Sequence, residues 1–177
     1  LDPDETFSDD PLRMMRAAYF SSKLGFKIET DCLNSIKRQA KRIKIVSCER
    51  IRDEFIKILK TPKPSLGLRI LQKTGLMEIV FPEIHIMYGM DQTKEWHHKD
   101  IFAHTLQVVD NAAQLSEKME LRFAALVHDI AKPQTRRIDD KKGYTFYGHD
   151  VIGERMINKV AKRMRLSNKI TEYLKKL

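Results

Sequence analysis

The sequence predicts an all-α protein. Apolar residues recur three or four positions apart along most of the 177-residue chain, which is the spacing that places them on one face of a helix. Proline and glycine stand between these segments, where helices start and stop. The exception is GYTFY, residues 143–147, where we expect a short extended segment inside a loop over residues 132–148.

The first helix is expected to begin at Asp10 and end at Gly25. Asp10 is a good N-cap, Pro11 suits the first helical position, and glycine is the usual stop. We expect residues 1–8, an acidic segment, to be irregular. The predicted apolar stripe of this helix consists of Leu12, Met15, Ala18 and Tyr19.

The same signals predict the other elements in order. Further helices are expected over residues 31–43, 47–59, 65–74, 100–115, 120–130 and 150–164, and again from Ser167. Ser47 would cap one of these helices and Gly75 would close another. Residues 76–90 are expected to form an apolar connector interrupted by Pro82, and the polar residues 91–98 are the best domain boundary.

Charge indicates a polyanionic partner. The formal net charge is +9, and residues 27–63 hold eleven basic against five acidic side chains. Such clustering favours nucleic acid as a partner, although it also suits an ordinary solvated surface. The basic side chains expected around the outside of the second helix are Lys37, Arg38, Lys41 and Arg42.

Other classes of protein are disfavoured by composition. No apolar run approaches the roughly 20 residues that a membrane span needs, so no membrane partner is expected. Cys32 and Cys48 are the only cysteines and give no disulfide framework. We therefore expect a cytoplasmic protein.

A histidine directly before an aspartate marks a candidate metal site. His128 and Asp129 end an apolar run, and His128 shares a helical face with Leu121 and Ala125 that is expected to point inward. A buried carboxylate is costly unless it is paired or bound to a metal, and His with Asp suits a divalent transition metal. The alternative is a helix C-terminus whose polar residues meet backbone or water.

Further histidines strengthen the metal interpretation. His104 lies between Ile101 and Val108 at helical spacing, so a second helix is expected to offer an inward histidine. His149, followed by Asp150, offers an additional ligand after the loop.

This pattern resembles the HD superfamily of metal-dependent phosphohydrolases. The resemblance implies a divalent metal held by His104, His128, Asp129 and His149. There are two departures from the family pattern. Ala131 stands where the family usually has glycine, and the final metal-binding aspartate of the family is expected beyond Leu177.

Asp10, Arg13 and Arg16 recur at a spacing of three on the predicted first helix. A carboxylate that accepts and guanidinium groups that donate hydrogen bonds can together read the edge of a nucleotide base. The alternative is an N-cap followed by two solvated arginines.

The segment around these residues resembles class II tRNA nucleotidyltransferases, which include CCA-adding enzymes and bacterial poly(A) polymerases. The matching motifs are Asp9–Asp10, Pro11–Leu12–Arg13, Arg16–Ala17, Phe20 and Leu24–Gly25–Phe26, with Asp9 in place of the usual Glu. The resemblance implies that Asp10 and Arg13, with Arg16 beside them, bind the base of CTP or ATP. It continues through residues 47–59 and 64–84, and then through the HD motifs.

The resemblance implies a domain organisation. Residues 1–26 would be the end of a nucleotidyltransferase head with its base-recognition helix, residues 27–90 a helical RNA-binding neck, and residues 91–177 a partial HD-domain helical bundle. Lys37, Arg38, Lys41 and Arg42 would bind tRNA in this arrangement.

The implied activity is addition of CCA, or part of it, to tRNA 3′ ends from CTP and ATP. The Mg²⁺ ions and the catalytic carboxylates belong to the head, which is expected upstream of Leu1, so this chain alone should not add nucleotides. Two alternatives stay open: an independent HD phosphohydrolase acting on nucleotides, and a non-catalytic basic RNA-binding module.

Overall fold

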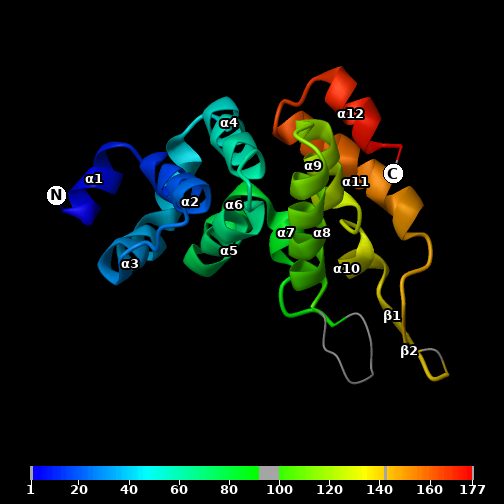
Figure 1. Cartoon of the computed structure of the whole chain (residues 1–177). Helices are drawn as coiled ribbons and strands as arrows, with labels where there is room; N and C mark the ends of the chain where they lie inside the picture. Colours follow the sequence, from blue (N-terminus) through cyan, green and yellow to red (C-terminus); the bar gives the residue numbers. More distant parts are fainter. Residues whose placement is uncertain (1, 92–99, 142, 177) are drawn as a thin grey trace.

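The computed structural model of the chain describes residues 2–91, 100–141 and 143–176. The helices follow one another from one end of an elongated array to the other, with the two termini far apart (Figure 1). The predicted all-α class is confirmed, since the only sheet in the described residues is a small two-stranded hairpin.

The first part of the array holds the helices up to residue 85. They are α1 (Pro3–Asp9), α2 (Arg13–Leu24), α3 (Thr30–Gln39), the 3₁₀ helix η1 (Ala40–Ile45), α4 (Cys48–Leu59), α5 (Pro64–Thr74), α6 (Leu76–Val80) and α7 (Pro82–His85). The second part holds α8 (Ile101–Leu115), α9 (Met119–Val127), α10 (Lys132–Thr135), β1 (Arg137–Asp139), β2 (Gly143–Thr145), α11 (His149–Arg163) and α12 (Asn168–Leu174).

The expectation of irregular structure before Asp10 is wrong, because α1 occupies that segment. The Asp2 carboxylate accepts a hydrogen bond from the Asp4 amide at 2.8 Å, Pro3 takes the first helical position, and Phe7 is buried. The helix expected from Asp10 starts later, at Arg13. Asp10 closes a turn before it by accepting a hydrogen bond from the Leu12 amide.

Glycine ends two of the helices as predicted. Gly25 and Gly75 adopt φ values of 73° and 81° after α2 and α5, a conformation that other residues rarely take. The helix predicted over residues 31–43 changes to 3₁₀ geometry at Ala40. The extended segment predicted within residues 143–147 is confirmed as β2, which pairs antiparallel with β1 in the register Ile138 opposite Tyr144.

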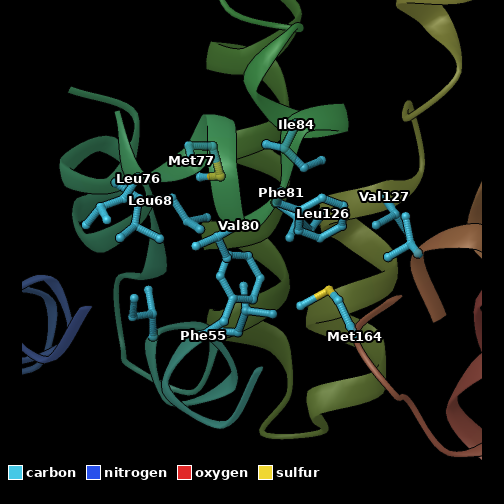
Figure 2. Packing of buried hydrophobic residues seen from close by; sticks show 14 of the residues in the cluster. Phe55, Leu68, Leu76, Met77, Val80, Phe81, Ile84, Leu126, Val127 and Met164 are labelled. Atoms are coloured by element: carbon cyan, nitrogen blue, oxygen red, sulfur yellow. The ribbon is translucent and has the colours of Figure 1, made fainter. Parts of the chain in front are cut away.

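The expected connector over residues 76–90 is instead part of the core. It forms α6 and α7, and its apolar side chains pack against α4, α5 and α9 in Figure 2. Three aromatic rings meet there, since the centroids of Phe55, Phe81 and Phe123 lie 5.6 to 6.4 Å apart. One hydrophobic cluster therefore runs through both parts of the array.

The predicted boundary over residues 91–98 lies outside the described residues, except for Asp91, which forms an isolated bridge with Asp100. Among the described residues, we find no helix both long and apolar enough to cross a membrane.

Candidate metal centre and nucleic-acid interface

Neighbouring helices bring three of the predicted metal ligands together. His104 lies near the start of α8, and His128 and Asp129 directly follow α9, which packs against α8. One ligand atom from each of the three residues lies within 4.8 Å of the others. The two imidazole rings meet edge to face, with centroids 5.5 Å apart.

The tautomer of His128 leaves a nitrogen suited to a metal. Its Nδ1 lies 2.8 Å from the Ala125 carbonyl oxygen, which can only accept, so Nδ1 carries a hydrogen. A neutral ring then presents the lone pair of Nε2, which lies 3.0 Å from Asp129 Oδ2. Two acceptors this close require a positive charge between them, supplied by a proton on Nε2 or by a metal ion.

Asp129 is an anion at neutral pH. Burial would raise the pKa of its carboxyl group, but the contacts with His128 and Lys132 outweigh burial and lower the pKa to about 2. Burial likewise lowers the pKa of His128, and Asp129 outweighs it, so that this pKa is raised.

The buried oxygen of Asp129 fits a metal ligand. Oδ2 lies 2.8 Å from Lys132 Nζ and 3.8 Å from His104 Nε2. Although these contacts are short, the buried Oδ2 has no hydrogen bond of satisfactory geometry within the described part of the chain. A carboxylate oxygen and two imidazoles are the donor set of many transition-metal sites, so the residues present fit a divalent ion.

His149 stands apart from this group. It begins α11, and its Nδ1 lies 2.8 Å from the Phe146 carbonyl oxygen, which fixes its tautomer as in His128. Its ligand nitrogens are not among the described atoms that lie within 4.8 Å of one another. Its role as a further ligand stays a prediction.

The two ligand histidines are not buried in the core as expected. The side chains of His104 and His128 are 34% and 27% exposed. The large apolar side chains that α9 buries are Phe123, Leu126 and Val127, so His128 lies at the rim of the core. This position leaves the candidate metal centre open to solvent, so that a metal ion or a substrate can reach it.

Sequence reasoning missed Lys132, which places a cation on Asp129 and lies 5.4 Å from the ring centroid of Phe146. Its spacing of three from Asp129 was a usable signal. Ala131, the departure from the family pattern, has φ −94° and needs no glycine conformation. It packs close to Gly153 of α11.

The predicted base-recognition residues lie at the start of α2 with separate partners. Asp10 Oδ2 lies 3.3 Å from Arg50 Nη2, and Arg13 donates to the Thr6 carbonyl at 3.2 Å. Arg16 Nε lies 3.5 Å from Glu54. Sequence reasoning missed Arg50, since its contact with Asp10 spans forty residues.

The predicted RNA-binding residues are all exposed on α3 and η1, but two of them hold α1 in place. Arg38 pairs with Asp4 at 2.6 Å, and Arg42 donates to the Ser8 carbonyl at 2.8 Å. The RNA-binding role of all four residues stays a prediction.

Comparison with known proteins identifies both parts of the chain. Residues 25–87 match the family described as "Probable RNA and SrmB- binding site of polymerase A", and residues 101–176 match the HD domain. The proteins named Multifunctional CCA protein from Psychromonas ingrahamii and Vibrio parahaemolyticus are 33% and 34% identical to this chain over 172 and 174 residues.

These alignments cover 94% and 95% of the chain but only 41% and 42% of the two relatives. The chain thus spans about two fifths of the length of the curated relatives that it matches. The two domain matches and these relatives together support a CCA-adding enzyme neck followed by an HD domain.

Proposed function

We propose that this chain is the part of a tRNA nucleotidyltransferase that holds tRNA and helps to select the nucleotide during addition of CCA, or part of it, to tRNA 3′ ends. The observation that carries the proposal is the collinear match of nearly the whole chain to proteins named Multifunctional CCA protein. CTP and ATP are the proposed nucleotides, and Mg²⁺ is the proposed ion of the head, outside this chain.

The proposed tRNA surface is the exposed side of α3 and η1. Lys37 and Lys41 contact phosphates, while Arg38 and Arg42 keep α1 packed beside them. Asp10, Arg13 and Arg16 are the proposed base-selecting residues, since a carboxylate and arginines at the start of α2 offer both acceptors and donors.

Salt-dependent binding of labelled tRNA tests the proposed surface. Lys37→Glu with Lys41→Glu should weaken binding and reduce the slope of log affinity against log salt by about one for each lost phosphate contact. Lys118→Glu changes a comparable exposed charge at the start of α9 and should leave the slope unchanged. Equal slopes for the wild type and the double variant would refute this surface.

A second activity, hydrolysis of phosphate esters at the HD site, is supported by the grouping of His104, His128 and Asp129. A divalent ion bound there would polarise the phosphoryl group and lower the pKa of a bound water. The His128 tautomer presents Nε2, Asp129 supplies negative charge, and Lys132 balances part of that charge.

Hydrolysis of p-nitrophenyl phosphate by the chain, with Mn²⁺, Co²⁺ or Ni²⁺ added, tests this second activity. Asp129→Ala should abolish it, and Arg13→Ala, remote from the HD site, should not. Activity that survives Asp129→Ala would assign the hydrolysis to a contaminant or to another site.

A further inference from the structure

A polar groove runs between α5 and α8 and reaches the candidate metal centre. The two helices pack against each other in the middle of the array (Figure 1). The groove has a volume of about 590 Å³ and includes His104 in its lining. Its size is within the range of roughly 300–1,000 Å³ that is typical of ligand sites.

One wall of the groove is a row of side chains on α8. His104, Gln107, Asn111 and Gln114 all line it, and their spacing of three or four residues puts them on one helical face. Ten residues of helix cover about 15 Å. The three amides are exposed, and each can both donate and accept hydrogen bonds, as nucleobase edges require.

The opposite wall is positively charged. Arg69 of α5 and Lys63, which directly precedes α5, are both exposed and line the groove. The carboxylate of Asp110 also lines it but is already bound to Ser65, through the amide at 2.9 Å and the hydroxyl at 2.6 Å. The groove therefore combines two available cations with a row of amides.

We propose that this groove binds single-stranded RNA, with phosphates at Lys63 and Arg69 and bases along the amides of α8, and that it leads the phosphorylated end of the strand to His104. This proposal rests on the proposed hydrolase activity of the HD site. It names the substrate of that site as the end of an RNA strand rather than a mononucleotide. Water attacks the terminal phosphorus, the P–O bond to the sugar breaks, and the sugar oxygen takes a proton, releasing inorganic phosphate.

The chemistry of the two walls distinguishes RNA from other anions. A purely cationic groove would bind any polyanion according to its charge. Here the amides outnumber the cations, and single-stranded nucleic acid presents bases that they can contact. A mononucleotide would occupy only part of the 15 Å row estimated from the helical rise.

Binding of a fluorescein-labelled oligoadenylate carrying a 3′-phosphate tests the groove. Lys63→Gln with Arg69→Gln should weaken binding to the whole chain about tenfold, the effect of losing roughly 1.4 kcal/mol of charged contacts. Lys73→Gln is the matched control, because Lys73 is exposed in the last turn of the same helix and is not among the residues that line the groove. Equal loss in the control, or none in the double variant, would overturn the proposal.

Polyphosphate separates recognition of bases from attraction of charge. Gln107→Ala with Asn111→Ala should weaken binding of the oligonucleotide several-fold and leave binding of polyphosphate unchanged. If both ligands bind alike to every variant, the groove is an unselective anion site and the proposal is wrong.

Measurements of hydrolysis test the proposal about the groove separately from the HD activity on which that proposal rests. The groove variants should raise KM for release of phosphate from the oligonucleotide and leave hydrolysis of p-nitrophenyl phosphate unchanged. A chain that hydrolyses neither substrate would overturn the HD activity and the delivery of RNA to it. Fluorescence anisotropy of the labelled oligoadenylate would then decide only whether the groove binds RNA. Unchanged KM values in the groove variants would overturn delivery even where the small ester is hydrolysed.

Discussion

Asp129 carries the chemistry of the candidate metal centre, because it is the buried anion to which both histidines turn. Asp129→Ala and His104→Ala should each lower the affinity for Mn²⁺ or Ni²⁺ by at least about tenfold, since even outer-shell changes at metal sites cost about 10–100-fold. Isothermal titration calorimetry on the metal-free chain measures this directly.

His85→Ala is a suitable control for the metal titration. His85 is a half-buried histidine whose Nδ1 lies 3.2 Å from Gln72, and it is not part of the grouped ligands. Its replacement should leave metal affinity unchanged. His149→Ala decides whether a further ligand comes from α11. Metal affinity that is indifferent to both Asp129 and His104 would remove the site.

Asp4 links pH to the attachment of α1. Its carboxylate accepts hydrogen bonds from Ser35, Arg38 and Gln39, and those from Ser35 and Arg38 are the main reason that its pKa is lowered. A lowered folded-state pKa stabilises the fold above the unfolded-state pKa, and this stabilisation is lost as pH falls through the folded-state pKa.

Asp4→Asn should therefore reduce the free energy of unfolding at pH 7, and the difference from wild type should shrink below about pH 4. Urea titrations at several pH values measure it. Asp9→Asn, at an exposed position on the same helix, should give a pH-independent difference near zero. A difference for Asp4→Asn that does not change with pH would contradict the linkage.

At the scale of single residues, the sequence predicted local patterns better than distant partners. His104, His128 and Asp129 were predicted to share a site because two consecutive helices were each expected to turn a histidine inward, and the three residues do lie together. The contact of Arg50 with Asp10 depends on how α4 packs beside α2. No periodicity in the sequence contains that information.

At the scale of helices, glycine lets α5 approach its neighbours closely. A Cβ at Gly67 would lie 2.6 Å from the Ile58 side chain and 3.2 Å from the Ala18 carbonyl oxygen. Gly67→Ala should destabilise the chain by up to roughly 2 kcal/mol, because the helix-propensity gain of about 1 kcal/mol offsets only part of an overpacking cost of about 1–3 kcal/mol.

Gly153→Ala is the matched control, since a Cβ there would meet Ile130 and Ala131 at the ordinary distances of 3.8 and 3.9 Å. The same substitution in α11 should be neutral or stabilising by up to about 1 kcal/mol. Thermal melts of both variants give the comparison. If Gly67→Ala stabilises the chain as much as Gly153→Ala, then the close approach of α5 does not limit packing.

Helices with clear boundaries were predictable, and short ones were not. Gly25 and Gly75 end helices where expected. The same Asp–Pro signal that was applied to Asp10 also occurs at Asp2, where the structure uses it to start α1. Elements as short as α6 and α7 complete too few turns for an apolar period to show.

At the scale of the whole molecule, the two parts of the array are joined by buried and charged contacts. Arg122 of α9 is buried and donates to the carbonyl oxygens of Leu59 and Thr61 in the first part, at 2.9 and 3.0 Å. Arg163 of α11 holds Glu83 with two hydrogen bonds of 2.7 and 2.6 Å. The domain limits at residues 26 and 90 stay predictions, but the core crosses the second of them.

The shared core predicts that both parts of the chain unfold together. Phe81 is fully buried between the Phe55 and Phe123 rings, which belong to different parts of the array. Phe81→Ala should cost about 3–5 kcal/mol, and it should lower amide protection in α4 and in α9 by the same amount. Hydrogen exchange under native conditions measures the two helices separately.

Phe20→Ala is the control for this test, because Phe20 is 51% exposed on α2 and surface substitutions usually change stability by less than about 0.5 kcal/mol. In calorimetry, wild type should show a single transition whose midpoint falls in Phe81→Ala and stays in Phe20→Ala. Two separate transitions in wild type, or loss of protection in α4 without loss in α9, would mean that the two parts fold as independent domains and that the aromatic contacts between them contribute little to their union.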